Sequence, residues 1–231
     1  VAINADGFKK SISSPGIGNY VTMAQSISNT LKLGCSIQDS IVIAHGTGTF
    51  QNRSTESDVL NRVAKGFELK NWKVTALKGM LGHTMGPAAG DELMTAIGIW
   101  NHGLIPGINT TKKLADDVLS DNLDFCLKSK EVDVKKIDAI YLNAKGFGGN
   151  NGSCGVVSPS FIKSKINKND LKIYETKLAA TEEKRAIYLE ESVNGKYDLI
   201  YRFNEEILDP TEDLKITKDK ISISNYKDID L

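Results

Sequence analysis

The 231-residue chain is 40% hydrophobic and 25% charged, which is typical of a globular protein large enough for one domain or somewhat more. Its 29 basic and 29 acidic residues cancel, so nothing predicts a general attraction to nucleic acid or to an acidic membrane. No apolar run approaches the ~20 residues of a membrane span. The three scattered cysteines, none in a C-x-x-C pair, favour a reducing, cytoplasmic setting.

Strands and helices are expected to alternate along the first two thirds of the chain. A helix is predicted after the turn at residues 14–16, with Met23, Ile27 and Leu31 at helical spacing and Gly34 as its stop. Strands are predicted at 40–44, 73–76, 137–143 and 153–158, and further helices at 55–67 and 90–100. This alternation indicates a layered α/β fold.

The composition changes near Phe161. From residue 162 onward, 28 of 70 residues are charged. Residues 171–191 have helical character, whereas Asn194 and Gly195 lie between β-forming residues at 188–189 and 197–203, a pattern that predicts a hairpin. We therefore expect a main domain at 1–161 and a small, charged α+β extension at 162–231.

Three glycine-rich segments come after predicted strands, at residues 44–49, 78–84 and 146–151. His45 can hold a neutral imidazole beside a reacting carbonyl, and the hydroxyls of Thr47 and Thr49 can bind an amide-bearing ligand. For this segment alone, a histidine that merely caps a turn is an equally good interpretation.

The second and third segments add a basic and an aromatic residue. Lys78 precedes His83 by five residues and can hold a carboxylate or tune the imidazole by its charge, although a tight helix entry is the alternative. Phe147 lies between glycines, so its ring can gate a pocket while its N–H contributes to an oxyanion hole; simple packing is the alternative. His102 is assigned to a helix end at the surface.

Other site classes are disfavoured. The chain has no G-x-x-x-x-G-K-[ST] or G-x-G-x-x-G motif for phosphates. Its histidines and cysteines lack the spacing of zinc ligands, so no metal is expected. The cysteines are interpreted as small structural residues because none has the basic or helix-start setting that activates a thiolate. They are Cys35, Cys126 and Cys154.

The three segments, within roughly residues 1–160, resemble the C-terminal half of β-ketoacyl-acyl-carrier-protein synthases, the condensing enzymes of the thiolase superfamily. The family pattern H-G-T-x-T-P-x-x-D-x-x-E matches at His45, Gly46, Thr47, Thr49 and Glu56. K-x-x-x-x-G-H-T-x-G-x-A-G nearly matches at 78–90, and N-x-x-G-F-G-G-x-N at 143–151. The resemblance implies a thiolase-like mixed sheet with helices on both faces. The third segment, with the charged C-terminal extension, resembles a longer bacterial subgroup of these synthases.

The resemblance also implies residue roles. His45 and His83 would assist decarboxylation of a malonyl thioester and stabilise the enolate. Lys78 would be the motif lysine, linked to Glu56. Thr47, Thr49 and Gly148 would bind substrate through its phosphopantetheine arm, and Phe147 would be the gate. The implied partners are an acyl carrier protein, malonyl and acyl thioesters, and a second copy of the protein; no cofactor of the chain's own is implied.

The chain departs from the family pattern at several points. The nucleophilic cysteine of the family lies well over 100 residues before the first histidine, so we expect it in an N-terminal half outside this chain. Residues 1–231 alone should therefore not condense. Phe50 replaces a proline, Arg53 an aspartate, and Lys145 a residue that is often phenylalanine. The Arg53 change puts the link between Lys78 and Glu56 in question.

Two other functions fit the same residues less well. A non-catalytic chain-length-factor-like partner is disfavoured by the presence of both His45 and His83. A thiolase, which condenses without decarboxylation, is disfavoured by Thr84, where thiolases tend to carry proline.

Overall fold

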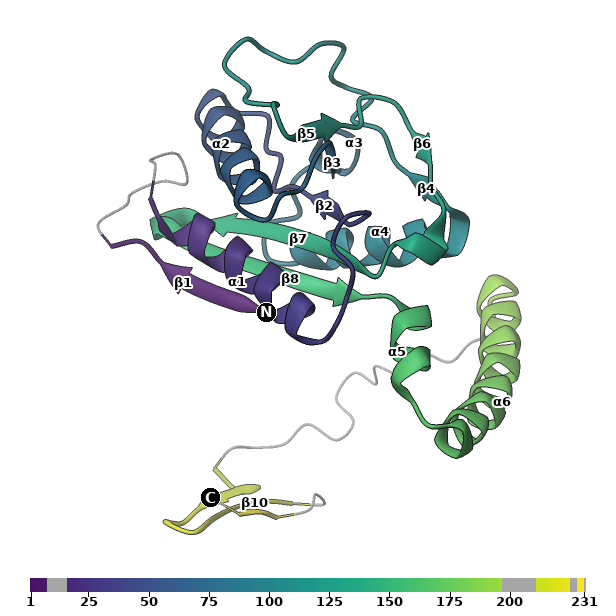
Figure 1. Cartoon of the computed structure of the whole chain (residues 1–231). Coiled ribbons are helices and arrows are strands. Elements are labelled where there is room, and N and C mark those ends of the chain that lie inside the picture. Colours follow the sequence, from purple (N-terminus) through teal and green to yellow (C-terminus); the bar gives the residue numbers. More distant parts are fainter. Residues whose placement is uncertain (8–15, 197–210, 225–227, 231) are drawn as a thin grey trace. The chain divides into compact units, whose positions relative to one another are not determined.

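The computed structural model describes residues 1–7, 16–196, 211–224 and 228–230 (Figure 1). Contacts divide the chain into two compact units, Val1–Lys168 and Asn169–Leu231. None of the described helices combines the length and apolar character needed to cross a bilayer.

The first unit is built on a six-stranded mixed sheet in the order β1-β8-β7-β2-β3-β5. Strands β7, β2, β3 and β5 are parallel, whereas β8 runs antiparallel to both β7 and β1. The bounds are β1 (Ala2–Ala5), β2 (Ile41–Ile43), β3 (Trp72–Thr75), β5 (Leu123–Phe125), β7 (Ala139–Gly146) and β8 (Asn150–Val157). The predicted mixed sheet is confirmed.

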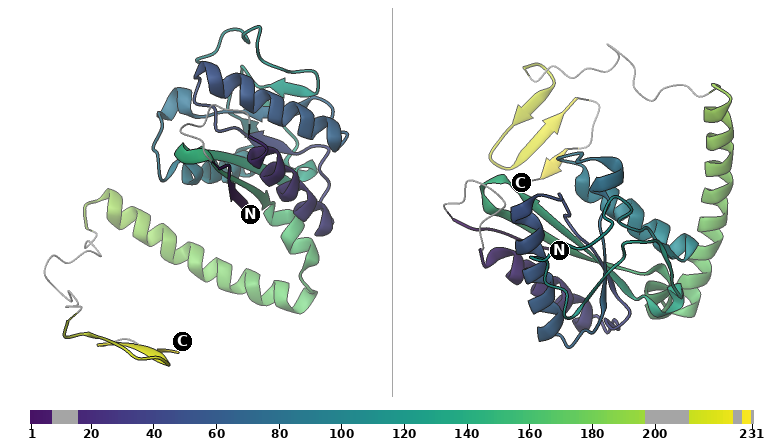
Figure 2. Two further views of the ribbon diagram at one scale, coloured as in Figure 1. Left: turned by 90° about the vertical axis from the view of Figure 1, so that its left-hand side faces the viewer. Right: turned by 90° about the horizontal axis from the view of Figure 1, so that it is seen from above.

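Helices cover both faces of this sheet, as predicted (Figures 1 and 2). Helices α1 (Gly18–Lys32) and α2 (Phe50–Gly66) pack on one face, and α4 (Ala88–His102) packs on the other. Successive β2 side chains alternate between the layers: Val42 belongs to the cluster with α1 and α2, whereas Ile41 and Ile43 belong to the cluster with α4. A strand that is buried on both faces is therefore apolar throughout.

Two details of the helices differ from the prediction. Helix α2 begins at Phe50 rather than at residue 55, because the Thr49 side chain accepts a hydrogen bond from the Asn52 N–H and caps the helix. In α1, Met23 and Ile27 are fully buried, but Leu31 is 41% exposed, so the buried stripe ends before it.

Short elements complete the first unit. Strands β4 and β6 form a separate antiparallel pair. The bounds are α3 (Lys78–Leu81), β4 (Leu104–Ile105), β6 (Lys130–Glu131), η1 (Val134–Lys136), η2 (Phe147–Gly149) and α5 (Pro159–Lys165).

The second unit contains the helix α6 (Lys168–Val193) and an antiparallel sheet in the order β11-β10-β9. The strands are β9 (Leu214–Ile216), β10 (Lys220–Ile223) and β11 (Ile229–Asp230). The helix predicted at 171–191 is present and longer than expected, and the unit contains both helix and strand.

The hairpin predicted around Asn194 and Gly195 is wrong in its first arm, because residues 188–189 lie inside α6. Gly195, at φ +66°, instead ends the helix: its N–H reaches the Ser192 carbonyl, and the Lys196 N–H reaches the Glu191 carbonyl. This is a Schellman cap, for which an Asn-Gly pair is as suitable as for a hairpin turn. The other predicted arm, 197–203, lies outside the described residues.

Candidate active site

The three glycine-rich segments meet at one edge of the sheet. Residues 44–49 come after β2, residues 76–84 after β3, and η2 after β7. These three strands are parallel neighbours, so their carboxyl ends lie together, which is where α/β sheets bind ligands. The first two loops come very close, since a Cβ added to Gly46 would lie 2.4 Å from the Ala76 Cβ.

The structure brings the two histidines together. The ring centroids of His45 and His83 lie 5.3 Å apart, with the ring planes at 82°. His45 is only 2% exposed, whereas His83 is exposed. The two imidazoles therefore lie edge to face, with His45 inside the fold and His83 at its surface.

The surroundings of His45 set its protonation. Burial is the main cause that lowers its pKa to about 4; the charge of Glu56 acts in the opposite direction, and those of Lys78, His83 and Lys145 lower it further. Its Nδ1 accepts the Lys145 N–H at 3.4 Å, while its buried Nε2 has no hydrogen-bond partner among the described residues. A neutral ring that accepts at Nδ1 carries its proton on Nε2. His45 therefore presents an unused N–H donor.

His83 is oriented in the same way, but by an N–H of its own loop. Its Nδ1 accepts the N–H of Met85 at 3.1 Å, and Met85 has a φ of +64°. The neutral form of this ring also carries its proton on Nε2. Each ring can therefore offer an Nε2–H donor, the kind of group that stabilises an oxyanion or enolate.

The buried carboxylate of Glu56 organises the first loop. Burial alone would raise its pKa, but the charges of Lys145 and His45, with hydrogen bonds to the carboxylate, lower the pKa below its usual value. The carboxylate accepts four hydrogen bonds: from the N–H groups of His45 (2.8 Å) and Gly46 (2.9 Å), and from the side-chain amides of Asn52 (2.9 Å) and Asn143 (2.7 Å). A charged Glu56 thus fixes the backbone that carries His45.

The expected link between Lys78 and Glu56 is wrong. The Lys78 ammonium pairs with Glu92 of α4 at 3.0 Å, and both side chains are nearly buried. Burial is the main cause that raises the pKa of Glu92 to about 7, although the charge of Lys78 lowers it. Sequence reasoning missed Glu92; the available signal was an acidic residue inside an apolar helix.

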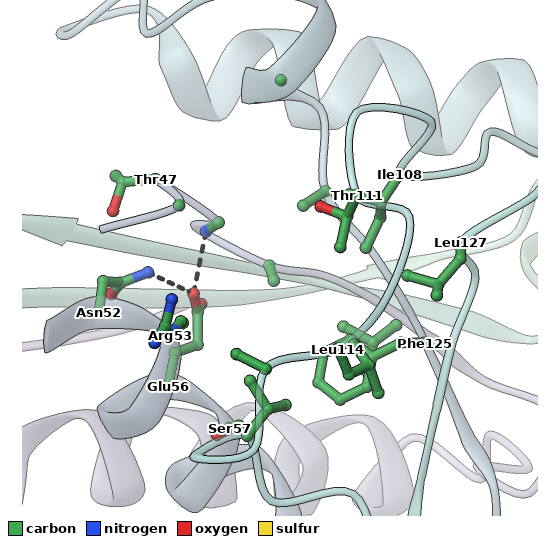
Figure 3. Close-up of a pocket in the computed structure, with 18 of the residues that line it drawn as sticks. Thr47, Asn52, Arg53, Glu56, Ser57, Ile108, Thr111, Leu114, Phe125 and Leu127 are labelled. Atoms are coloured by element: carbon green, nitrogen blue, oxygen red, sulfur yellow. Dashed lines mark hydrogen bonds between the residues drawn. The ribbon is translucent and has the colours of Figure 1, made fainter. Parts of the chain in front are cut away.

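A pocket of about 310 Å³ opens beside the first loop (Figure 3). Its polar side carries Thr47, Asn52, Arg53 and Glu56, and its apolar side is formed by Ile108, Leu114, Phe125 and Leu127. Such a pocket suits a ligand with both polar and apolar parts.

Arg53 joins α2 to the loop that forms the far wall of this pocket. The Arg53 guanidinium makes hydrogen bonds of 2.8 and 3.1 Å to the two carboxylate oxygens of Asp117, and it lies 4.2 Å from the centroid of the Phe50 ring. The two unusual residues of the first motif thus contact each other, and the positive charge at position 53 is paired with Asp117.

The remaining candidates lie at the same edge of the sheet. The Thr47 and Thr49 hydroxyls are 3.2 Å apart, and that of Thr49 also caps α2. Phe147 and Gly148 lie in η2, where the Phe147 side chain is 67% exposed and Gly148 has a φ of +81°.

The other possible ligands and nucleophiles are the acidic residues and the cysteines. The described residues contain no group of three or more His, Cys, Asp or Glu side chains that could hold a metal ion. Burial raises the pKa of Cys126 to about 11, and burial is also the main cause that raises the pKa of Cys35. Neither thiol is activated as a nucleophile.

The chain is similar to known β-ketoacyl synthases. The profile of the family described as "Beta-ketoacyl synthase, C-terminal domain" matches residues 1–112. The β-ketoacyl-[acyl-carrier-protein] synthase FabY of Pseudomonas aeruginosa is 36% identical over 98% of the chain, which spans 36% of that relative's length. Subunit alpha of the Saccharomyces cerevisiae fatty acid synthase is 29% identical over 64% of the chain and 8% of its own length.

The same likeness holds in three dimensions. The crystal structure of the noncanonical ketosynthase FabY from Pseudomonas aeruginosa superimposes with a TM-score of 0.84 and 34% identity. The match covers all of this chain and 37% of that one. The chain thus spans little more than a third of the synthase it resembles.

Proposed function

We propose, because the chain belongs to the β-ketoacyl synthase family, that it supplies the histidine side of a decarboxylating Claisen condensation site. One observation carries the proposal. The two neighbouring imidazoles each accept a backbone N–H at Nδ1, so in the neutral ring the proton is on Nε2, which can donate to a substrate oxygen. In this function the enzyme joins an acyl thioester to a malonyl thioester in fatty acid or polyketide synthesis.

The first step is the loss of carbon dioxide from the malonyl group. The C–C bond to the carboxylate breaks, carbon dioxide leaves, and the bonding electrons move through the α-carbon onto the thioester oxygen. His45 and His83 stabilise this enolate by donating their Nε2–H groups. Neutral donors suit this step because they require no proton transfer to hold the developing charge.

The second step forms the new carbon–carbon bond. The enolate carbon attacks the acyl carbonyl of a thioester on a cysteine, which lies in the N-terminal half of the synthase. The tetrahedral oxyanion accepts the N–H of Phe147, whose ring gates the acyl group. The C–S bond then breaks, the thiolate leaves, and the product is a β-ketoacyl thioester.

The remaining residues bind and support the substrate. Thr47, which lines the pocket, and Thr49 hold the phosphopantetheine arm, which arrives on an acyl carrier protein or coenzyme A and is not a resident cofactor. Gly148 lets the chain pass close to the thioester, while Lys78 and Glu56 support the two histidine loops. We place the enzyme in the cytoplasm as a homodimer, with residues 1–161 as its catalytic portion and 162–231 as an extension.

The test is a donor comparison with the full-length protein. With an acyl primer, a malonyl thioester should yield carbon dioxide and a β-ketoacyl product in equal amounts, and an acetyl thioester should yield neither. Equal use of the acetyl donor would indicate a thiolase instead. Absence of carbon dioxide release from the malonyl donor would indicate a non-catalytic partner subunit.

A further inference from the structure

Lys145 is a buried lysine beside the candidate active site. It lies in β7 and is only 8% exposed, and a charge this deeply buried requires compensation. Its ammonium donates to the Asn52 Oδ1 at 3.3 Å, and the Asn52 amide in turn donates to Glu56 at 2.9 Å. The charge of Lys145 is the strongest of the influences that lower the pKa of Glu56. Its side chain therefore balances the carboxylate that fixes the first loop.

The backbone of the same residue orients the imidazole. The N–H of Lys145 donates to the Nδ1 of His45, so the ring keeps its proton on Nε2. If His45 took up a second proton, its Nδ1–H would face the Lys145 N–H, donor against donor. The backbone contact is thus compatible only with a neutral His45.

Four charged or titratable groups face His45 from separate elements: Glu56 of α2, Lys78 of α3, His83 of the loop after α3 and Lys145 of β7. Only Glu56 favours the imidazolium. Burial opposes it most strongly, then the charges of Lys78 and His83, and then that of Lys145, which acts from the neighbouring strand and also offsets Glu56. Arg53 is the other basic residue that departs from the family motifs. Its guanidinium pairs with Asp117, so Arg53 does not take the place of Lys145.

We propose that Lys145 is a positioning residue, whose ammonium and backbone N–H together hold His45 neutral with its Nε2–H directed at the substrate. This inference rests on the proposed function and adds to it the origin of the histidine's protonation state. The family pattern often has phenylalanine at the position of Lys145. This control of His45 therefore follows from a residue particular to this chain's sequence.

The test compares charge-removing and charge-keeping variants of the full-length protein. In Lys145→Met, the charge of Glu56 is no longer opposed from β7, so His45 should protonate more easily. The acid limb of malonyl decarboxylation should move up by less than about one pH unit, because burial and the charge of Lys78 still disfavour the imidazolium. Lys145→Arg keeps the charge, so the acid limb of its pH profile should match that of the wild type. The exposed Lys136→Met serves as the control and should not move it.

A second measurement separates this proposal from the proposed function. Isotope-edited NMR titration of the His45 ring requires no turnover, and it should show the same upward shift in Lys145→Met. Lys145→Gln removes the charge but keeps a hydrogen-bonding group for Asn52, and it gives the same comparison if the methionine variant folds poorly. An unchanged His45 titration in a folded neutral variant would overturn the role of Lys145. Absence of decarboxylation in the wild type would overturn only the proposed function.

Discussion

The two histidine loops come after neighbouring parallel strands, and both rings accept one backbone N–H at Nδ1, from β7 for His45 and from its own loop for His83, yet their surroundings differ. His45 is enclosed by the fold and supported by a carboxylate with four hydrogen bonds. His83 is exposed, and apolar side chains around its loop and on α4 are exposed as well: Met80, Leu81, Met85, Leu93 and Met94. The chain therefore desolvates one histidine itself and leaves the other open.

The comparison shows that the orientation of an imidazole ring and its removal from water have separate causes. A single backbone N–H to Nδ1 is sufficient to select the protonated nitrogen in both loops. Lowering the pKa of His45 to about 4 requires burial as well, together with the nearby cations that oppose Glu56. The two histidines should thus share a chemical role while differing in their structural role, and mutation can separate the two.

Replacement of each histidine gives the largest expected effect. His45→Ala and His83→Ala should each reduce malonyl decarboxylation by about 10²- to 10³-fold, since each removes a donor to the enolate. Their stabilities should differ: about 1–3 kcal/mol is expected to be lost in His45→Ala and less than about 0.5 kcal/mol in His83→Ala. Carbon dioxide release and urea denaturation measure the two effects. Equal destabilisation would contradict the distinction between a buried and an exposed histidine.

Glu56→Gln tests the support of the enclosed loop. Removing this buried charge leaves Lys145 uncompensated and turns an amide donor toward groups that already donate, so we expect a loss of about 3 kcal/mol in the free energy of unfolding. Urea denaturation of the full-length protein measures this loss. Glu131→Gln, at an exposed site in β6, is the matched control and should be nearly neutral. A Glu56→Gln variant as stable as the wild type would show that the carboxylate does not organise the loop.

Glu92→Gln should change stability by an amount that depends on pH. Burial raises the pKa of Glu92 from about 4.5 to about 7, so the folded protein binds this proton more tightly than the unfolded chain. The contribution is fully present below pH 4.5 and is lost as pH rises through 7. The wild type should therefore lose about 3 kcal/mol more than Glu92→Gln between about pH 4.5 and 8. His45 has the opposite dependence, but it is common to both proteins and cancels. Parallel pH profiles of the two unfolding free energies would contradict the assignment.

Much of the fold can be predicted from local patterns. The segments predicted as strands at 40–44, 73–76 and 137–143 contain the parallel strands β2, β3 and β7, whose apolar side chains pack against the helices on both faces of the sheet. The glycine-rich segments after these strands form one site, as expected, since parallel neighbours bring their carboxyl ends together. The resemblance to condensing enzymes is what assigns roles to His45 and His83.

Other features are not contained in local patterns. An Asn-Gly pair suits both a hairpin turn and a Schellman cap, and the length of α6 decides between them. The motif pattern links Lys78 to Glu56, but the ammonium reaches Glu92 in the layer formed by α4. The charge of Lys145 is visible in the sequence, whereas its position against Glu56 is not.

The sequence by itself determined which residues are candidates for the chemistry, because the motifs place His45 and His83 in glycine-rich segments beyond the ends of predicted strands. Only the tertiary structure decided the charge on those residues. Protonation depends on burial and on cations and carboxylates within a few ångströms, and at His45 these come from segments as far apart as residues 56 and 145. Long-range packing, which no local pattern encodes, therefore determines whether the imidazole at the end of β2 is a neutral donor.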